Sequence, residues 1–144
     1  MKPIKKTFFL FLLVGALASI LYTGCEPVDN TTGGDPRTPY VGEWQFIERL
    51  KSTEGQSYFV TIALDPSNSS QVIIGNLGNP GSQDITVKGV VTSSQVIVSS
   101  QSMSDGWIIE GSGSFNTTAK NIMDWTYSIK AGGNYDTYTA TASR

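Results

Sequence analysis

The chain has 144 residues, a formal net charge of −2, no histidine and one cysteine. This length allows one domain at most. The absence of histidine excludes Ser-His-Asp and Cys-His catalysis and histidine-ligated zinc, and a lone cysteine excludes an intramolecular disulfide and a cysteine-rich metal site. We therefore expect a protein that is not an enzyme and that uses no cofactor and no metal.

The first 24 residues have the composition of a secretory signal. Lys2, Lys5 and Lys6 form a basic head, and residues 8–21 are an apolar run without a charge. The run is shorter than the roughly 20 apolar residues that a membrane-spanning helix needs, and it suits the hydrophobic region of a signal peptide. We expect residues 1–24 to be a targeting segment that is removed.

The only cysteine follows this segment directly, in the sequence Thr23-Gly24-Cys25. A thiolate is a far better nucleophile than a hydroxyl, so cysteine is the natural side chain to accept a diacylglycerol thioether. The polar flank after it offers no core for a buried cysteine. The sequence resembles the lipobox that ends bacterial lipoprotein signals. This resemblance implies cleavage after Gly24, acylation of Cys25 and a lipid anchor in the cell envelope, at the outer membrane.

A polar tether and an acidic domain follow the cysteine. Residues 25–39 are rich in Pro, Gly, Asp, Asn and Thr, and such a segment cannot bury enough apolar surface to offset the entropy of ordering. The folded domain is therefore expected over residues 40–144. Without the signal, seven Lys and Arg remain against 12 Asp and Glu, a net charge of −5. Because nucleic-acid binding needs clustered Lys and Arg, we expect no nucleic-acid partner.

Hydrophobic residues after Tyr40 recur with a period of two, and clusters of Gly, Asn, Asp, Ser and Pro separate the runs. This pattern predicts eight β-strands and no sustained helix. The links are short, so successive strands should be antiparallel neighbours, and pairing the first strand with the last protects both edges. The sequence therefore predicts an all-β, eight-stranded antiparallel up-and-down barrel in preference to a two-sheet sandwich. The predicted strands are 40–50, 57–65, 70–78, 84–92, 94–102, 106–115, 121–131 and 135–144.

The same alternation assigns one face of each strand to the barrel interior. Eight-stranded barrels are just wide enough for side chains to fill them, so a filled interior is one interpretation. The other is an aromatic mouth that holds a ligand, because small-molecule sites are concave, aromatic and sparsely polar. The expected interior residues are Trp44, Phe46, Val60, Ile62, Ile74, Val87, Val96, Ile109, Phe115, Trp125, Tyr127 and Ile129. The possible ligand-lining residues are Tyr58, Trp107, Trp125, Tyr127 and Tyr135.

Four carboxylates in the strands are candidates for paired acid and base chemistry on a glycoside. Three of them are out of phase with large apolar neighbours, and the fourth, Glu48, stands near the end of the first strand. We interpret all four as solvated positions on strand faces. They are Glu43, Glu48, Glu110 and Asp124.

A glycine and a tryptophan, Gly42 and Trp44, open the first strand, and Arg144 ends the last one. They resemble the G-x-W motif of lipocalins, in which the Trp packs across the closed base of the barrel and an Arg near the end of the last strand lies over its ring. The resemblance implies that these three residues form a barrel-base motif. With the runs GEWQF, IIGNLG, IIEGSGSF, DWTYSI and YDTYTAT, the domain is similar to small lipocalin-like lipoproteins of the Bacteroidetes type.

These observations predict a lipid-anchored, non-enzymatic protein of the cell envelope. Its expected partners are the membrane, through the lipid anchor, and either a small apolar or sugar-like ligand or a partner protein. The alternative is a structural or accessory outer-membrane lipoprotein with a filled barrel and no ligand.

Overall fold

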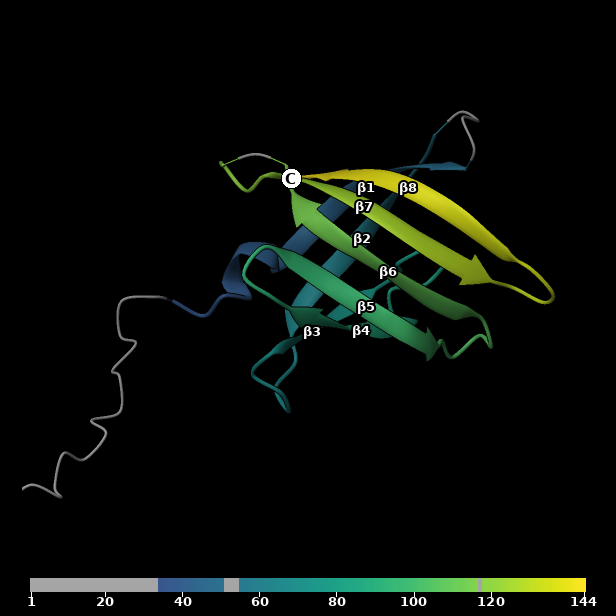
Figure 1. Cartoon of the computed structure of the whole chain (residues 1–144), viewed down its shortest axis with the longest axis horizontal. Helices are drawn as coiled ribbons and strands as arrows, with labels where there is room; N and C mark the ends of the chain where they lie inside the picture. Colours follow the sequence, from purple (N-terminus) through teal and green to yellow (C-terminus); the bar gives the residue numbers. More distant parts are fainter. Residues whose placement is uncertain (1–33, 51–54, 117) are drawn as a thin grey trace, which may run out of the picture. The chain divides into compact units, whose positions relative to one another are not determined.

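A computed structural model describes residues 34–50, 55–116 and 118–144 of the chain. The expected signal, the cleavage after Gly24 and the acylated Cys25 lie outside these residues. One short 3-10 helix, η1, precedes eight strands (Figure 1). The elements are η1 Thr38–Tyr40, β1 Gly42–Leu50, β2 Gln56–Leu64, β3 Gln71–Gly75, β4 Thr86–Val91, β5 Gln95–Ser102, β6 Ile108–Phe115, β7 Ile122–Lys130 and β8 Tyr135–Ser143.

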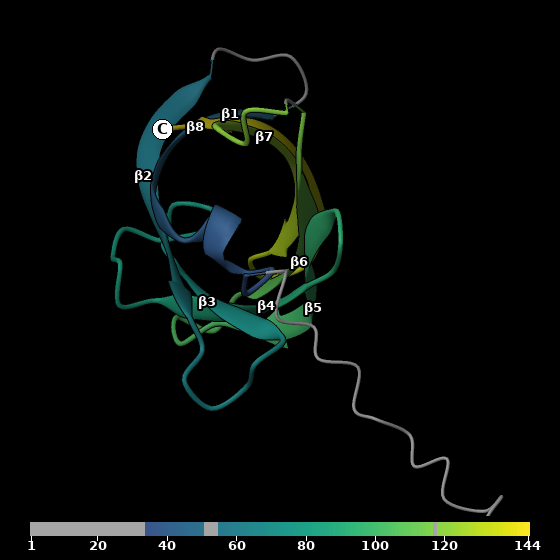
Figure 2. The ribbon, with the colours of Figure 1, turned by 90° about the vertical axis from the view of Figure 1, so that its left-hand side faces the viewer.

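The strands form a closed antiparallel barrel in the order of the sequence. β1 closes the ring by pairing with both β2 and β8, so that Phe46 stands opposite Tyr58 on one side and Ala142 on the other. Figure 2 shows this ring of strands with η1 inside its outline. The predicted all-β, eight-stranded up-and-down barrel is therefore confirmed.

The interior follows the predicted alternation. Of the twelve side chains expected inside, eleven are buried, and Phe115 is half-buried against the same core. A strand's successive side chains point to opposite faces, so a period of two in the sequence becomes one apolar wall of the barrel. Glu43, Glu110 and Asp124 are exposed, as predicted.

Two glycines on β6 allow residues of β7 to approach closely. Gly111 is paired with Tyr127, and Gly113 with Trp125. A Cβ atom at Gly113 would overlap the Trp125 ring, and one at Gly111 would overlap Tyr127. The Trp125 ring therefore lies over Gly113, which a side chain there would prevent, and at Gly111 the Cα and Cβ atoms of Tyr127 come close.

A glutamine side chain extends the shortest strand pairing of the barrel. β4 and β5 share only the pairs Val90↔Ile97 and Val91↔Val96, and the register between β5 and β6 shifts between Val98 and Gln101. Gln101 Oε1 accepts a hydrogen bond from the Lys88 amide at 2.8 Å, and its Nε2 donates to the Lys88 carbonyl at 2.8 Å. The Gln101 side chain thus makes the two hydrogen bonds with the Lys88 backbone that a paired residue of β5 would otherwise make.

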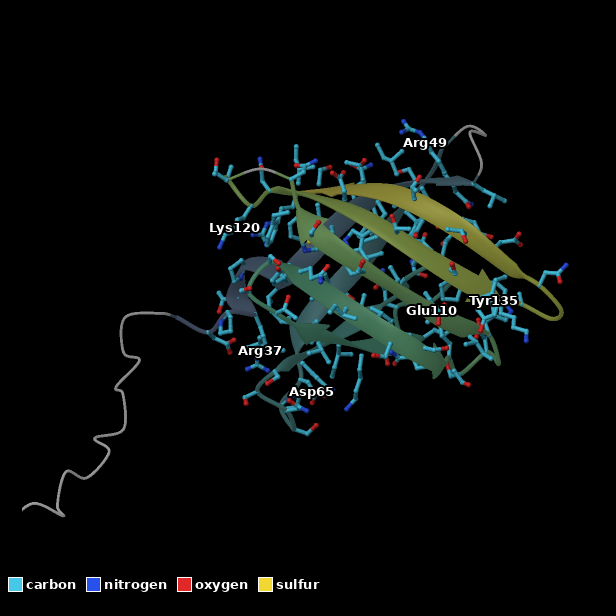
Figure 3. All side chains as sticks on the ribbon, in the orientation of Figure 1. Arg37, Arg49, Asp65, Glu110, Lys120 and Tyr135 are labelled. Carbon is cyan, nitrogen blue, oxygen red and sulfur yellow. The ribbon has the colours of Figure 1, made fainter. Side chains whose placement is uncertain are left out.

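The domain begins earlier than predicted. Arg37 is buried, and its Nη1 donates to the carbonyl oxygens of Asp65, Asn68 and Gln71 at 3.2, 2.8 and 3.0 Å (Figure 3). Its guanidinium also forms an ion pair with Asp35 at 2.6 Å. The predicted start at Tyr40 is thus too late. A polar composition indicated a tether there, but one arginine fixes this segment to the β2–β3 loop.

The two ends of the barrel differ. At the closed end, Tyr40 of η1 is buried and stacks on Phe115, with ring centroids 4.6 Å apart. Trp44 Nε1 donates to the Tyr40 carbonyl at 2.8 Å, and the guanidinium carbon of Arg144 lies 4.4 Å from the centroid of the Trp44 ring. Gly42 has a φ of 135°, a backbone conformation that suits glycine. The closed end is therefore plugged by side chains.

Candidate functional site

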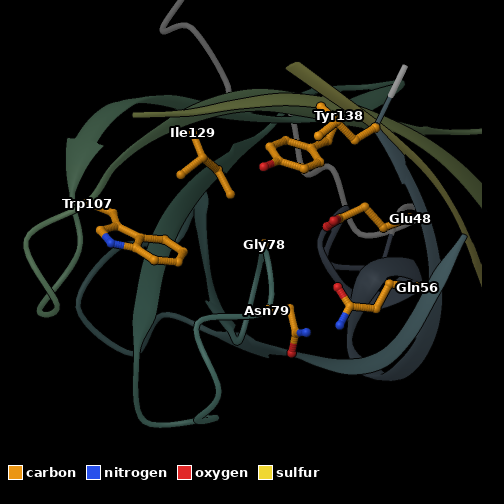
Figure 4. Close-up of a pocket in the computed structure, with 8 residues that line it drawn as sticks. Glu48, Gln56, Gly78, Asn79, Trp107, Ile129 and Tyr138 are labelled. Atoms are coloured by element: carbon orange, nitrogen blue, oxygen red, sulfur yellow. The ribbon is translucent and has the colours of Figure 1, made fainter. Parts of the chain in front are cut away.

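A cavity of about 390 Å³ lies at the other, open end of the barrel (Figure 4). The ends of β1, β2, β7 and β8 and the β3–β4 and β5–β6 loops supply its walls. Glu48 is the one charged side chain among the described residues that line it. Amides, aromatic rings and aliphatic groups make up the rest. The lining residues are Glu48, Leu50, Gln56, Gly78, Asn79, Trp107, Ile129 and Tyr138.

The register between β1 and β2 positions the polar side chains of one cavity wall. Glu48 and Gln56 are directly paired across β1 and β2, so their side chains project into the barrel side by side. The opposite wall comes from the end of β7, where Ile129 lies, and from the β5–β6 loop. That loop is a tight turn in which the Met103 amide donates to the Trp107 carbonyl at 2.7 Å. Trp107 is thereby held at the rim.

The β3–β4 loop turns into the barrel and narrows the mouth. The strand predicted over 70–78 ends at Gly75, because Asn76, Gly78 and Asn79 all have positive φ, at 63°, 78° and 54°. Leu77 is only 1% exposed and fills part of the interior. A Cβ atom at Gly78 would overlap the Ile129 side chain, so glycine is required for this close approach.

The floor of the cavity is a carboxylate joined to two tyrosines. Tyr58 Oη donates to Glu48 Oε2 at 2.9 Å, Tyr127 Oη donates to the same oxygen, and the two hydroxyl oxygens are 2.8 Å apart. Tyr127 in turn stacks on Tyr138, with centroids 5.6 Å apart. These contacts hold the carboxylate in one orientation, facing the cavity (Figure 4).

The interpretation of Glu48 as a solvated position is wrong. The side chain is only 7% exposed. Glu48 is in phase with Trp44 and Phe46, so the alternation of β1 carries it inward. A strict period of two would have predicted this, whereas its closeness to the strand end suggested solvent.

Burial controls the ionisation of the tyrosines. It raises the pKa of Tyr58 far above the ordinary value, and the negative charge of Glu48 adds to the rise. Burial also raises the pKa of Tyr127, with further contributions from Tyr58 and Glu48. The pKa of Tyr138 is raised by burial first and then by Asp136. The phenols therefore stay protonated at neutral pH and act as hydrogen-bond donors.

The structure places the five predicted ligand-lining residues in four different settings. Trp107 lines the cavity. Tyr58 and Tyr127 are not among the lining residues, but their hydroxyls donate to the carboxylate of Glu48, which is one of them. Trp125 lies deeper in the core, 5.7 Å from the Phe46 ring, and its buried Nε1 has no hydrogen-bond partner among the described residues. Tyr135 is 49% exposed and lies under Lys130 instead of in the cavity.

Sequence reasoning missed most of the polar lining. Gln56 begins β2 and Tyr138 lies within β8, both in phase with inward residues, so the period of two could have found them. Asn79 belongs to a loop whose inward fold depends on positive φ values that the sequence pattern does not specify.

Two further properties concern the described residues. No three His, Cys, Asp or Glu side chains among them are close enough together to hold a metal ion. In the same residues, no helix is long and apolar enough to cross a membrane.

Comparison with known proteins identifies similar folds. No protein-family model matches the sequence, and no curated protein matches it. Among solved structures, a redesigned β-barrel matches with a TM-score of 0.54 and 12% identity, covering 76% of this chain and 95% of its own. The redesigned β-barrel mFAP1, bound to DFHBI, matches with a TM-score of 0.53 and 13% identity, covering 77% and 100%. EF1p2_mFAP2b bound to DFHBI matches with a TM-score of 0.51 and 14% identity, covering 77% and 99%. At these identities the likeness establishes the β-barrel fold.

Proposed function

We propose that this chain is a lipid-anchored, non-enzymatic protein of the cell envelope that binds a small molecule in the open end of its barrel. The observation that carries this proposal is the cavity of about 390 Å³ with a fixed carboxylate at its floor. Ligand sites are typically clefts of roughly 300–1,000 Å³ that combine apolar and aromatic walls with a few oriented polar groups. The cavity has each of these properties.

The arrangement of the core supports binding at one end only. The closed half is filled by buried rings, among them Trp44, Phe46 and Trp125. Around the cavity, in contrast, the walls are held by the register of the strands and by hydrogen bonds, which limits the ordering that binding would require. A ligand would therefore enter between the open-end loops and stop above the Tyr58–Tyr127 pair.

The similar barrels add a precedent. Two of them, mFAP1 and EF1p2_mFAP2b, have structures in which DFHBI is bound. A barrel of this fold can thus hold a small molecule. This supports the proposed class of function, and the chemistry of a ligand for this chain has to come from its own lining residues.

The expectation of a non-enzymatic role rests on residue types. The sequence has no histidine. Glycoside hydrolysis uses a pair of carboxylates across the scissile bond, and Glu48 is the one carboxylate among the described lining residues. A single carboxylate with two neutral phenols is suited to recognition.

The anchor is proposed from the sequence around Cys25. Its test is the variant Cys25→Ser, followed through membrane fractionation and labelling with a fatty acid. Loss of the label and release from membranes would support the anchor. A variant that still takes up the label and stays with the membranes would overturn it.

Native mass spectrometry of the protein extracted from its own membranes tests ligand binding. The expected result is a stoichiometric small ligand on the wild type and its loss in Gln56→Trp, which places a large ring in the cavity wall. The matched control is Ser57→Trp, on the outward face of the same strand. A wild-type barrel that carries no ligand and takes up none would instead favour a structural or accessory role.

A further inference from the structure

The carboxyl group of Glu48 lies at the floor of the cavity, and it bears on the class of ligand. This inference rests on the proposed function, and it concerns the chemistry of the molecule bound. We propose that the open end recognises a small organic cation, a protonated amine with an aromatic or apolar body, through Glu48.

The carboxylate of Glu48 is buried where the cavity meets the core. Glu48 is 7% exposed, and its Oε2 accepts hydrogen bonds from both Tyr58 and Tyr127. A carboxylate accepts hydrogen bonds and repels other anions. A buried charge is costly unless it is paired, and among the described residues the structure gives it two neutral donors and no cationic partner. An ammonium group in the cavity would supply the missing positive charge.

Two aromatic side chains form part of the cavity wall. Trp107 and Tyr138 both line the cavity that the carboxylate faces (Figure 4). Aromatic faces attract cations through their quadrupole, most strongly for Trp, and the same rings pack against an apolar body. Gln56 and Asn79 add amide groups that can pair with further polar atoms of the ligand. The carboxylate and the aromatic rings therefore both favour a protonated amine with an aromatic or apolar body.

The test compares three probes of nearly equal shape: tryptamine, which is cationic, tryptophol, which is neutral, and indole-3-propionate, which is anionic. Calorimetry at neutral pH gives their affinities for the full chain. We expect tryptamine to bind at least about tenfold more tightly than tryptophol, because a hydrogen bond to a charged group is worth more than a neutral one, and indole-3-propionate to bind most weakly. In Glu48→Gln the cation should lose its advantage over the neutral probe.

A second pair of variants changes exposed residues, so that their effects do not depend on whether a buried substitution disturbs folding. Gln56 is exposed yet lines the cavity, and Ser57 is exposed on the outward face of β2. Gln56→Lys should weaken tryptamine binding about tenfold, whereas Ser57→Lys, with the same change in net charge, should leave it within about twofold.

The possible outcomes separate the two proposals. Equal affinities for the three probes, or a preference for the anion, would overturn cation recognition and leave a binding cavity in place. Binding of none of the three at millimolar concentration, together with a ligand-free protein from the native membrane, would overturn both. Tryptamine binding that is equally affected by Gln56→Lys and Ser57→Lys would place the cation outside the cavity and also overturn the inference.

Discussion

Arg144 lies over the indole ring of Trp44 and ties the last residue of the chain to the first strand. Its guanidinium carbon is 4.4 Å from the ring centroid, and its Nη1 and Nη2 donate to the carbonyls of Val41 and Pro39 at 2.8 and 3.1 Å. The lipocalin resemblance implied this contact. One side chain at the closed end of the barrel thus contacts Pro39 of η1, Val41 just before β1, and the Trp44 ring of β1.

Removing that side chain should destabilise the barrel. We expect Arg144→Ala to lower the free energy of unfolding by about 1–2 kcal/mol, through the lost cation–π contact and hydrogen bonds. Arg49→Ala, on the exposed face of β1, is the control and should change it by less than about 0.5 kcal/mol. Urea unfolding measures both. Equal effects of the two variants would argue against a fastening role.

Two tryptophans should respond differently to truncation. Trp44 is fully buried at the closed end, so Trp44→Ala should cost about 3–5 kcal/mol in unfolding free energy. Trp107 is half-buried in the cavity wall, so Trp107→Ala should cost about 1 kcal/mol and weaken ligand binding instead. A near-neutral Trp44→Ala would reject Trp44 as a core residue.

A methyl group on β6 should disturb the core. Gly113→Ala places a Cβ atom against the Trp125 ring, and overpacking of this kind costs about 1–3 kcal/mol. Gly133→Ala in the β7–β8 loop meets no atom within 4 Å and serves as the matched control. Thermal unfolding should show a lower midpoint for Gly113→Ala alone. An unchanged midpoint would mean that Trp125 does not lie flat over Gly113.

The β2–β3 loop should make stability depend on acid pH. Hydrogen bonds from Lys88 and then Ser67 lower the pKa of Asp65 from 3.8 to about 2. A lowered pKa means that the stabilisation is complete above the ordinary value and is lost as the pH falls through the folded one. Wild type should therefore be more stable than Asp65→Asn at pH 5, and the difference should shrink between pH 4 and pH 2. A difference that does not change with pH would contradict the ion pair's role.

Much of the fold could be predicted from the sequence because two local rules suffice. The period of two in the hydrophobic residues predicted the eight strands and the face that each one buries. The short links predicted that neighbouring strands are antiparallel. The pairing of β1 with β8 then follows from the need to protect two edges. The same rules do not predict the conformation of the loops or their contacts. Arg37 was assigned to a polar tether from its local composition. Its three hydrogen bonds to carbonyls of the β2–β3 loop join residues far apart in the sequence, and a local pattern does not show such contacts.

The candidate site could be predicted only in part for a related reason. Aromatic content pointed to Trp107, which lines the cavity, and to Tyr58 and Tyr127, which hydrogen-bond Glu48 in its wall. Glu48 was assigned to solvent because a charge at a strand end is usually hydrated, yet its phase along β1 decides its direction. The inward turn of Leu77 depends on positive φ values at Asn76, Gly78 and Asn79. Asn and Gly adopt such values readily, but this preference does not say that the loop turns into the barrel.

The central claim is that the open end of the barrel, and not its closed end, binds a small molecule. The chain's three tryptophans report on it directly, since Trp107 lines the cavity, Trp125 lies in the core and Trp44 lies at the closed end. In a titration of the ¹⁵N-labelled protein with tryptamine, the account predicts that the indole N–H signal of Trp107 shifts with saturation while that of Trp44 stays in place. A saturable shift at Trp44 alone, or no shift at any of the three, would contradict it.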